Sequence, residues 1–182
     1  MLGFDIRPEI PRQIFRGGSF EADAWIFLAD ADPLPSAGDV VVGKDRFLIE
    51  ATAIHSRTGA IGVLMTPGES LDGIADHLDR IALIVLRIAK YSDGRPYSVA
   101  RLLRDRHGYR GEIRATGDVL RDQIVFLLRA GFDSFDIQQP GTIAALQSGS
   151  IVAVHRHYQP ASADDREMLV GHRPWLRLSS PL

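Results

Sequence analysis

Residues 81–89 form the longest strongly apolar run of the chain and constrain its fold more than any other segment. The run reads Ile-Ala-Leu-Ile-Val-Leu-Arg-Ile-Ala, and Arg87 is its single charged residue. Nearly continuous aliphatic residues are typical of a parallel strand that is buried on both faces. A membrane-spanning helix needs about 20 apolar residues, so this run is too short to be one. It therefore predicts a central strand of a covered parallel sheet.

Strand-like and helix-like segments alternate on both sides of this run. We expect strands at 25–29, 61–66, 81–89, 112–116, 134–137 and 151–157, separated by helices at 44–57, 69–80, 97–107, 119–130 and 142–147. Such alternation implies right-handed crossovers between parallel strands. The predicted fold class is α/β, with an open parallel sheet and helices on both faces, either flavodoxin-like or a half-barrel of βα repeats. About four to six strands are too few for a closed eight-stranded barrel.

The length of 182 residues suits one domain with a full core. We expect that domain to cover residues 1–158. Its first 24 residues contain Pro8, Pro11 and the Gly17-Gly18 pair, which indicates an N-terminal arm or a short edge hairpin. Residues 159–182 are expected to form a C-terminal tail, either disordered or docked on a neighbouring subunit.

Composition excludes several classes of function. The net charge of −2 gives no reason to expect a nucleic-acid partner. The chain has no cysteine, which excludes disulfides, thiolate nucleophiles and cysteine-ligated iron–sulfur clusters. The first residues lack the pattern of a signal peptide, so we expect a cytoplasmic protein with no membrane partner. His155 and His157 alternate along a predicted strand, but no third ligand accompanies them, and we expect no metal site.

Two charged loops follow predicted strands, at residues 90–98 and 116–122. Parallel-sheet proteins bind ligands in loops at the carboxyl ends of their strands. The sequence therefore predicts a ligand or docking site, whereas the catalytic residues remain unknown. The candidate residues are Lys90, Asp93, Gly94, Arg95, Tyr97, Ser98, Arg114, Gly117, Asp118, Arg121 and Asp122.

These residues have a functional and a structural interpretation. In the functional one, Gly94 permits a tight turn, Arg95 offers a planar fork to an oxyanion, and two helix N-termini point at the same crevice. Sulfite, phosphate or a flavin phosphate would suit such a crevice. In the structural one, Asp93-Gly94 is a common turn and Ser98 or Asp118 is a helix N-cap. Arg121 and Asp122 would then pair with Arg101, Arg104 or Arg114, lock neighbouring helices and define a docking face.

The sequence also resembles a known bacterial family. The resemblance lies in Tyr-Ser-Asp-Gly-Arg-Pro-Tyr-Ser at 91–98, Ala-Arg-Leu-Leu-Arg at 100–104, Gly-Asp-Val-Leu-Arg-Asp-Gln at 117–123 and Gly-Phe-Asp at 131–133. These segments are similar to the signature of the DUF934 family, closely over 81–135 and loosely over 44–158. Tyr91 stands where the family usually has Phe, and Pro96 where Gly is commoner.

The resemblance implies a function by association alone. Family members are described as probable oxidoreductases of sulfite reduction, because their genes accompany those of the sulfite reductase haemoprotein. We therefore expect an accessory or oxidoreductase component of assimilatory sulfite reduction, with that haemoprotein as a partner. One alternative is a flavin- or phosphate-binding enzyme that uses the crevice at the carboxyl ends of the strands. A second is a non-catalytic, homo-oligomeric interaction module.

Overall fold

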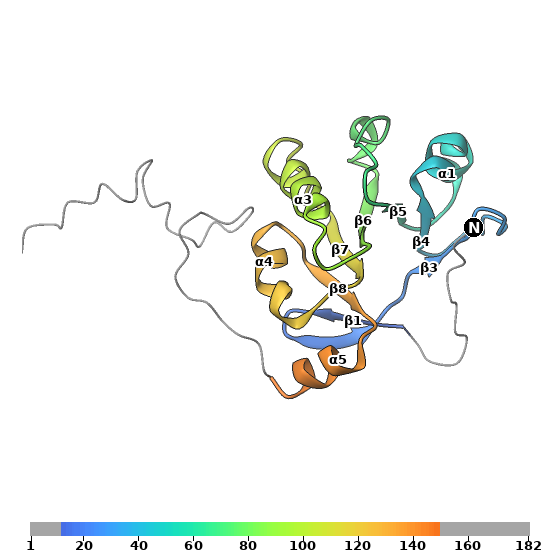
Figure 1. Ribbon diagram of the computed structural model, residues 1–182. Helices are drawn as coiled ribbons and strands as arrows, with labels where there is room; N and C mark the ends of the chain where they lie inside the picture. Colours follow the sequence, from blue (N-terminus) through green and yellow to red (C-terminus); the bar gives the residue numbers. More distant parts are fainter. Residues whose placement is uncertain (1–11, 150–182) are drawn as a thin grey trace, which may run out of the picture.

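The computed structural model describes residues 12–149, which form one mixed sheet of eight strands with helices packed against it (Figure 1). The strands are β1 (Gln13–Arg16), β2 (Ser19–Ala22), β3 (Ile26–Phe27), β4 (Val40–Gly43), β5 (Ile61–Met65), β6 (Ile81–Ile88), β7 (Glu112–Gly117) and β8 (Ser134–Ile137). The helices are α1 (Lys44–Ile49), α2 (Ala51–Ser56), α3 (Arg95–Asp105), α4 (Ile124–Arg129) and α5 (Pro140–Gln147), with short 3₁₀ turns at Ala75–His77 and Arg121–Gln123.

The strands follow the order β2-β1-β8-β7-β6-β5-β4-β3 across the sheet. Strands β3 to β8 are parallel, and β1 joins β8 and β2 in antiparallel fashion. In a flavodoxin-like sheet the strand order reverses once, which places helices on both faces. Here the order from β3 to β8 is sequential, and α1, α3 and α4 lie on the convex side of the sheet (Figure 1). The predicted α/β class is confirmed, and the half-barrel is the architecture observed.

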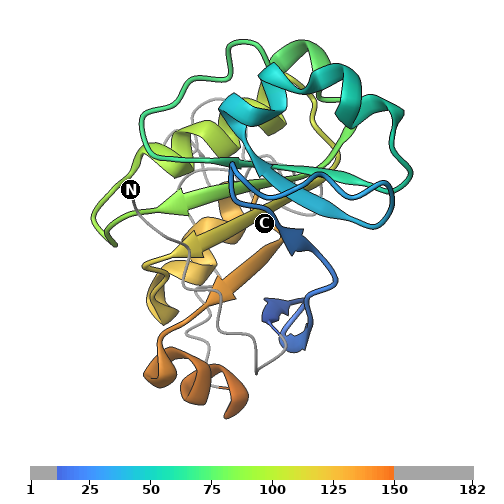
Figure 2. The ribbon, with the colours of Figure 1, turned by 90° about the vertical axis from the view of Figure 1, so that its right-hand side faces the viewer.

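A short connection forces the sheet to curl. Only residues 23–25 separate β2 from β3, although these strands stand at opposite ends of the strand order. An extended chain from residue 22 to residue 26 spans at most about 14 Å. At the usual spacing, the outer strands of a flat eight-stranded sheet would lie roughly 33 Å apart. The sheet therefore bends until its two ends approach, and the labelled strands form an arc in Figure 1, while Figure 2 shows the same strands along their length.

Two predicted helices differ from the observed elements, and one strand was missed. No helix covers 69–80, because Gly73 adopts a φ of +81° and only the 3₁₀ turn at Ala75–His77 follows. The expected helix at 44–57 is divided at Glu50, whose φ of −98° and ψ of 17° are not helical. Strand β4 was not predicted, because its short run Val-Val-Val-Gly directly precedes a helix and shows no period of its own.

Other boundaries shift by a few residues. Strand β3 is shorter than the expected strand at 25–29, and α3 begins at Arg95 rather than at residue 97. The expected helix at 119–130 is reduced to a 3₁₀ turn followed by α4, since Leu120 is still extended. The predicted strand at 151–157, with His155 and His157, and the predicted tail lie outside the described residues.

Side chains that alternate along the strands divide between two cores. On the convex side, Ile84 and Leu86 of β6 join a large apolar cluster beneath the helices. On the concave side, Leu83 and Val85 of the same strand form a smaller cluster with Val41 and Leu64. Trp25 and Phe27, from the connection and β3, pack onto this smaller cluster. This connection therefore covers the apolar half of the concave face.

The other half of the concave face is charged. Arg114 in the middle of β7 is fully buried, and its guanidinium binds both carboxylate oxygens of Asp23, each at 2.9 Å. The Asp23 side chain is also fully buried. Glu112 binds Arg114 at 2.9 Å and accepts further bonds from Arg16 and Ser134. Burial alone would raise the pKa of Glu112, but the Ser134 hydrogen bond and the two arginines outweigh it and hold that pKa below its usual value.

We expect Arg114→Met to destabilise the fold by about 3–5 kcal/mol, because it leaves the Asp23 carboxylate buried without its cation and removes one of the two cations that Glu112 binds. Urea unfolding at neutral pH measures this change. Arg101→Met is the matched control, since Arg101 forms a partly exposed pair with Asp105 at 3.7 Å. That control should change stability by less than about 0.5 kcal/mol. Equal losses in the two variants would contradict a structural role for the buried pair.

Candidate functional site

The loops that follow β6 and β7 meet at the backbone of Tyr91. A carboxylate oxygen of Asp118 accepts a hydrogen bond from the Tyr91 N–H at 2.9 Å. The side-chain amide of Gln123 donates to the Tyr91 carbonyl oxygen at 2.5 Å. The two loops lie side by side because Ile88 and Gly117 are paired at the ends of neighbouring strands. Residues 90–95 and 117–123 thus form one braced surface, which we name the Tyr91 rim.

Gly117 directs the second loop toward the first. Its φ is +96°, a conformation that glycine adopts without strain. A Cβ atom at this position would overlap the carbonyl oxygen of Ile88. The Asp118 N–H donates to the same oxygen at 2.9 Å, which fixes the backbone that carries the Asp118 carboxylate. Glycine at residue 117 is therefore a requirement of the brace.

Gln123 uses both ends of its amide. Its side-chain oxygen accepts a bond from the Leu120 N–H at 3.2 Å, while its nitrogen reaches Tyr91. The first contact stabilises the start of the 3₁₀ turn, and the second joins that turn to the opposite loop. The two contacts together orient the amide. The segment 117–123 therefore bonds both the N–H and the carbonyl oxygen of Tyr91.

The turn at residues 90–95 is closed by its own charges. The Asp93 N–H donates to the Lys90 carbonyl oxygen at 2.9 Å. The Asp93 carboxylate accepts bonds from the Arg95 backbone at 3.1 Å and from two guanidinium nitrogens at 2.9 and 2.8 Å. The side-chain and backbone bonds from Arg95 lower the pKa of Asp93. Asp93 and Arg95 thus form a fork-like pair at the start of α3.

This pair also uses helix amides that could serve an anion. The Arg95 N–H is bonded to Asp93, and Pro96 has no N–H to offer. Of the first three helical residues, Tyr97 alone has a backbone N–H that neither the bond to Asp93 nor the proline ring removes. Gly94 has a φ of −81° and a ψ of −8°, which any residue can adopt. The tight turn predicted at Gly94 therefore does not depend on a glycine.

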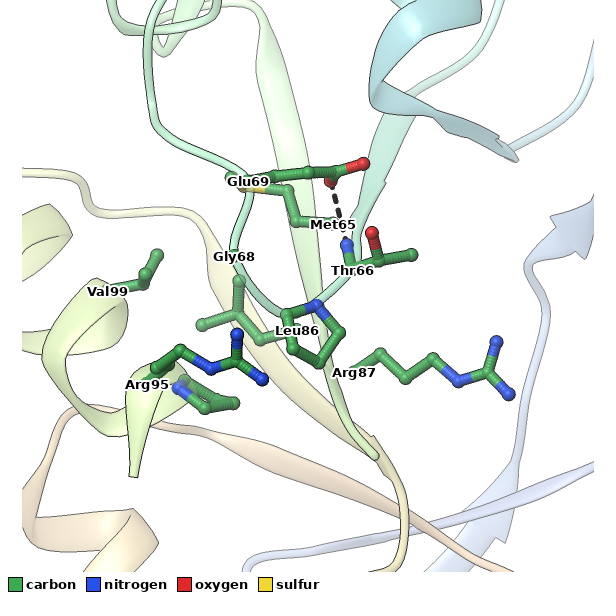
Figure 3. A pocket seen from close by; sticks show the side chains of 10 residues that line it. Met65, Thr66, Gly68, Glu69, Leu86, Arg87, Arg95 and Val99 are labelled. Atoms are coloured by element: carbon green, nitrogen blue, oxygen red, sulfur yellow. Dashed lines mark hydrogen bonds between the residues drawn. The ribbon is translucent and has the colours of Figure 1, made fainter. Parts of the chain in front are cut away.

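A shallow notch lies beside the rim, between the carboxyl ends of β5 and β6 and the start of α3. Residues 65–69, Leu86, Arg87, Arg95, Pro96 and Val99 line it. Figure 3 shows the Arg95 guanidinium extending over the notch from one side, while Arg87 points away on the other. The space is about 230 Å³ and includes open solvent. The part of it that the protein encloses is only about 10 Å³, room for one water molecule, so a larger ligand such as a flavin ring would lie mostly in solvent.

Arg87 belongs instead to a polar row on the concave face. It pairs in register with Thr116, which pairs with Asp136 on the next strand. The Thr116 hydroxyl donates to Asp136 at 2.9 Å, and Arg12 binds the same carboxylate. The Arg12 guanidinium also stacks over the Phe27 ring, 4.0 Å from its centre. This row extends the buried charges of β7 toward the carboxyl ends of the strands.

The remaining predicted residues fall in different places. Tyr97 is half-buried against Phe132, and burial, aided by the negative charge of Asp122, raises the pKa of its phenol. Asp122 is exposed in the 3₁₀ turn and Arg121 is half-buried there. Ser98 is exposed within α3. The helix therefore begins three residues before Ser98.

Three structural expectations need correction. Ser98 and Asp118 are not helix N-caps, because Gly94 precedes α3 and Gln123 precedes α4. Arg114 lies outside the rim, buried on the concave face with Asp23. The other two arginines proposed as partners of Arg121 and Asp122 form ion pairs with different acids. Arg101 binds Asp105, and Arg104 binds Asp133 at 2.5 Å.

Sequence reasoning missed the residues that hold the rim together. Tyr91 and Gln123 were quoted only as parts of the signature and were not proposed as site residues. Gln123 gives a usable signal, since a side-chain amide three residues after Leu120 is the spacing at which a side chain bonds a helix start. Its contact with Tyr91 joins residues that lie 32 positions apart, and no local pattern predicts it.

The fold and the site together define the class of protein. The protein is a curled α/β half-barrel whose polar loops brace one another at the carboxyl ends of β6 and β7. Comparison with known families matches residues 62–169, more than half of the chain, to the DUF934 family, described as a bacterial protein of unknown function. The chain belongs to this family. No curated protein and no solved structure matches it.

Two features are absent from residues 12–149. No helix in that range combines the length and apolar character needed to cross a bilayer. No group of three or more histidine and carboxylate side chains there is arranged to hold a metal ion.

We expect Asp118→Ala to loosen the rim without unfolding the protein. The Tyr91 amide would lose its acceptor, and a hydrogen bond of about 1 kcal/mol corresponds to roughly fivefold faster amide exchange. Hydrogen–deuterium exchange resolved at residues 91–94 measures this change. Asp122→Ala is the control, since Asp122 is an exposed carboxylate in the same turn. Unchanged exchange at Tyr91 in the Asp118 variant would show that the brace does not hold the loop in solution.

Proposed function

We propose that this protein is an accessory component of assimilatory sulfite reduction in the cytoplasm, and that it docks on the sulfite reductase haemoprotein through the Tyr91 rim. The resemblance that suggested sulfite reduction supplies the process and the partner. The observation that carries the docking role is the brace of Asp118 and Gln123 on Tyr91. It presents a rigid, exposed surface at the edge of the sheet where parallel-sheet proteins bind ligands and partners.

The chemistry of the chain supports an accessory role over a self-sufficient redox enzyme. Without cysteine, the chain cannot supply a redox thiol or ligate a cysteine-bound cluster. Two carboxylates of the rim are engaged in holding its own loops. Asp93 binds Arg95, and Asp118 binds the Tyr91 amide. A surface that is rigid before contact loses little conformational entropy on binding, which favours docking.

The first test is direct binding. We expect the purified full-length protein to bind purified sulfite reductase haemoprotein with micromolar or tighter affinity in isothermal titration calorimetry, because a preorganised rim reduces the entropic cost of association. Serum albumin in place of the haemoprotein controls for non-specific binding. A deletion strain should also grow more slowly on sulfate as the sole sulfur source than on cysteine. No heat of binding together with normal growth on sulfate would reject the proposal.

The notch supports one alternative function, a flavin- or phosphate-binding enzyme. Arg95 could hold an oxyanion there, since its side chain is 63% exposed and Asp93 leaves one end of the guanidinium near Gly68.

For this alternative we expect wild-type protein to retain sulfite, phosphate or flavin mononucleotide, and Arg95→Ala to lose that binding. The cause would be loss of the fork that meets the anion, with the melting temperature nearly unchanged because Arg95 is exposed. Equilibrium dialysis measures the small anions, and an absorption spectrum after soaking and desalting measures the flavin. Arg101→Ala, on the exposed side of α3, is the control. No retention by the wild type would remove this alternative.

A further inference from the structure

Tyr91 is an exposed loop residue whose backbone is held by side chains of another loop. The residue is 60% exposed, whereas its N–H and its carbonyl oxygen are each held by a side chain of the neighbouring loop. Loop residues with exposed backbones ordinarily bond to water. Here two side chains from 27 and 32 positions away fix the backbone of one exposed aromatic residue. The ring can rotate about its side-chain bonds, but the backbone that carries it is held in place.

This arrangement matches the energetic requirements of an interface anchor. Tyrosine is enriched among residues whose truncation costs most binding energy, because it buries a large ring and offers a hydroxyl for one hydrogen bond. A fixed backbone removes part of the ordering cost that a mobile loop would incur on binding. By contrast, Phe126 on α4 is equally exposed, at 56%, but belongs to an ordinary helix face. The bracing distinguishes Tyr91 from the other exposed apolar side chains.

The charges beside Tyr91 indicate what its partner offers. Lys90 directly precedes it and Arg95 follows four residues later, and both are exposed, as is Asp122 on the other loop of the rim. The carboxylates of Asp93 and Asp118 are bonded to donors of the rim itself. They therefore partly balance these cations and are less available to a partner. A complementary protein surface would have an apolar pocket for the ring, an acceptor for its hydroxyl and a carboxylate beside the pocket.

We propose that Tyr91 is the anchor residue of the docking surface, and that it inserts into an apolar pocket bordered by carboxylates on the haemoprotein. This inference rests on the proposed function, because it names the contact through which that docking occurs. Asp118 and Gln123 are then positioning residues that act through the Tyr91 backbone. Arg95 and Lys90 contribute charge at the border of the contact.

The test compares variants in calorimetric binding to purified haemoprotein. We expect Tyr91→Ala to weaken binding at least tenfold, and Tyr91→Phe, which keeps the ring, to remain within about threefold of wild type. Phe126→Ala is the matched control and should bind as wild type does. Asp118→Ala should weaken binding by an intermediate factor while leaving the ring in place. Circular dichroism should show all four variants folded, since each of these side chains lies at least partly outside the core.

The outcomes separate this inference from the proposed function. If the wild type does not bind the haemoprotein, the proposed function fails. If the wild type binds and Tyr91→Ala binds equally well, docking stands but the anchor is elsewhere. If Tyr91→Ala keeps haemoprotein binding but loses retention of flavin mononucleotide, the ring belongs to a ligand site and the inference is overturned. A tenfold loss specific to Tyr91→Ala, with Phe126→Ala unaffected, supports it.

Discussion

The three-residue connection from β2 to β3 is the constraint on which the rest of the structure depends. It joins the two ends of an eight-stranded order, so the sheet must curl until those ends approach. Alternate residues of this crossing face the concave side: Asp23 binds Arg114, and Trp25 packs on the apolar cluster. The same few residues therefore close the sheet, neutralise its buried cation and cover its apolar half. Loss of any one of these would expose the others to water.

Curling of the sheet also explains why charge is buried in β7. The convex side is covered by helices and is filled with aliphatic side chains. The concave side is narrow near β7, β8 and β1, where the long side chains of Arg114 and Arg16 span the space and meet Glu112. Buried ion pairs are often no more stabilising than apolar packing, but they fix one geometry. We infer that this network specifies how the N-terminal hairpin lies against β8 more than it adds stability.

Prediction from sequence succeeded where local pattern determines structure. The apolar run at 81–89 became β6 almost residue for residue, and β8 was predicted with its observed bounds. Prediction failed where contacts between residues far apart in the sequence determine the structure. Nothing near Arg114 in the sequence indicates burial, because its partner Asp23 lies 91 residues away. The rim could be placed, since the ends of neighbouring parallel strands are adjacent, but its centre at Tyr91 depended on Gln123 across the loop.

Arg95 and Tyr91 take different parts in the rim and the notch. Arg95 takes part in both features, since its guanidinium closes the turn through Asp93 and also extends over the notch. Tyr91 takes part in the rim, and the residues that line the notch do not include it. A small anion seated in the notch would compete with Asp93 for the same guanidinium and so loosen the turn. Occupation of the notch would then loosen the rim through a single side chain.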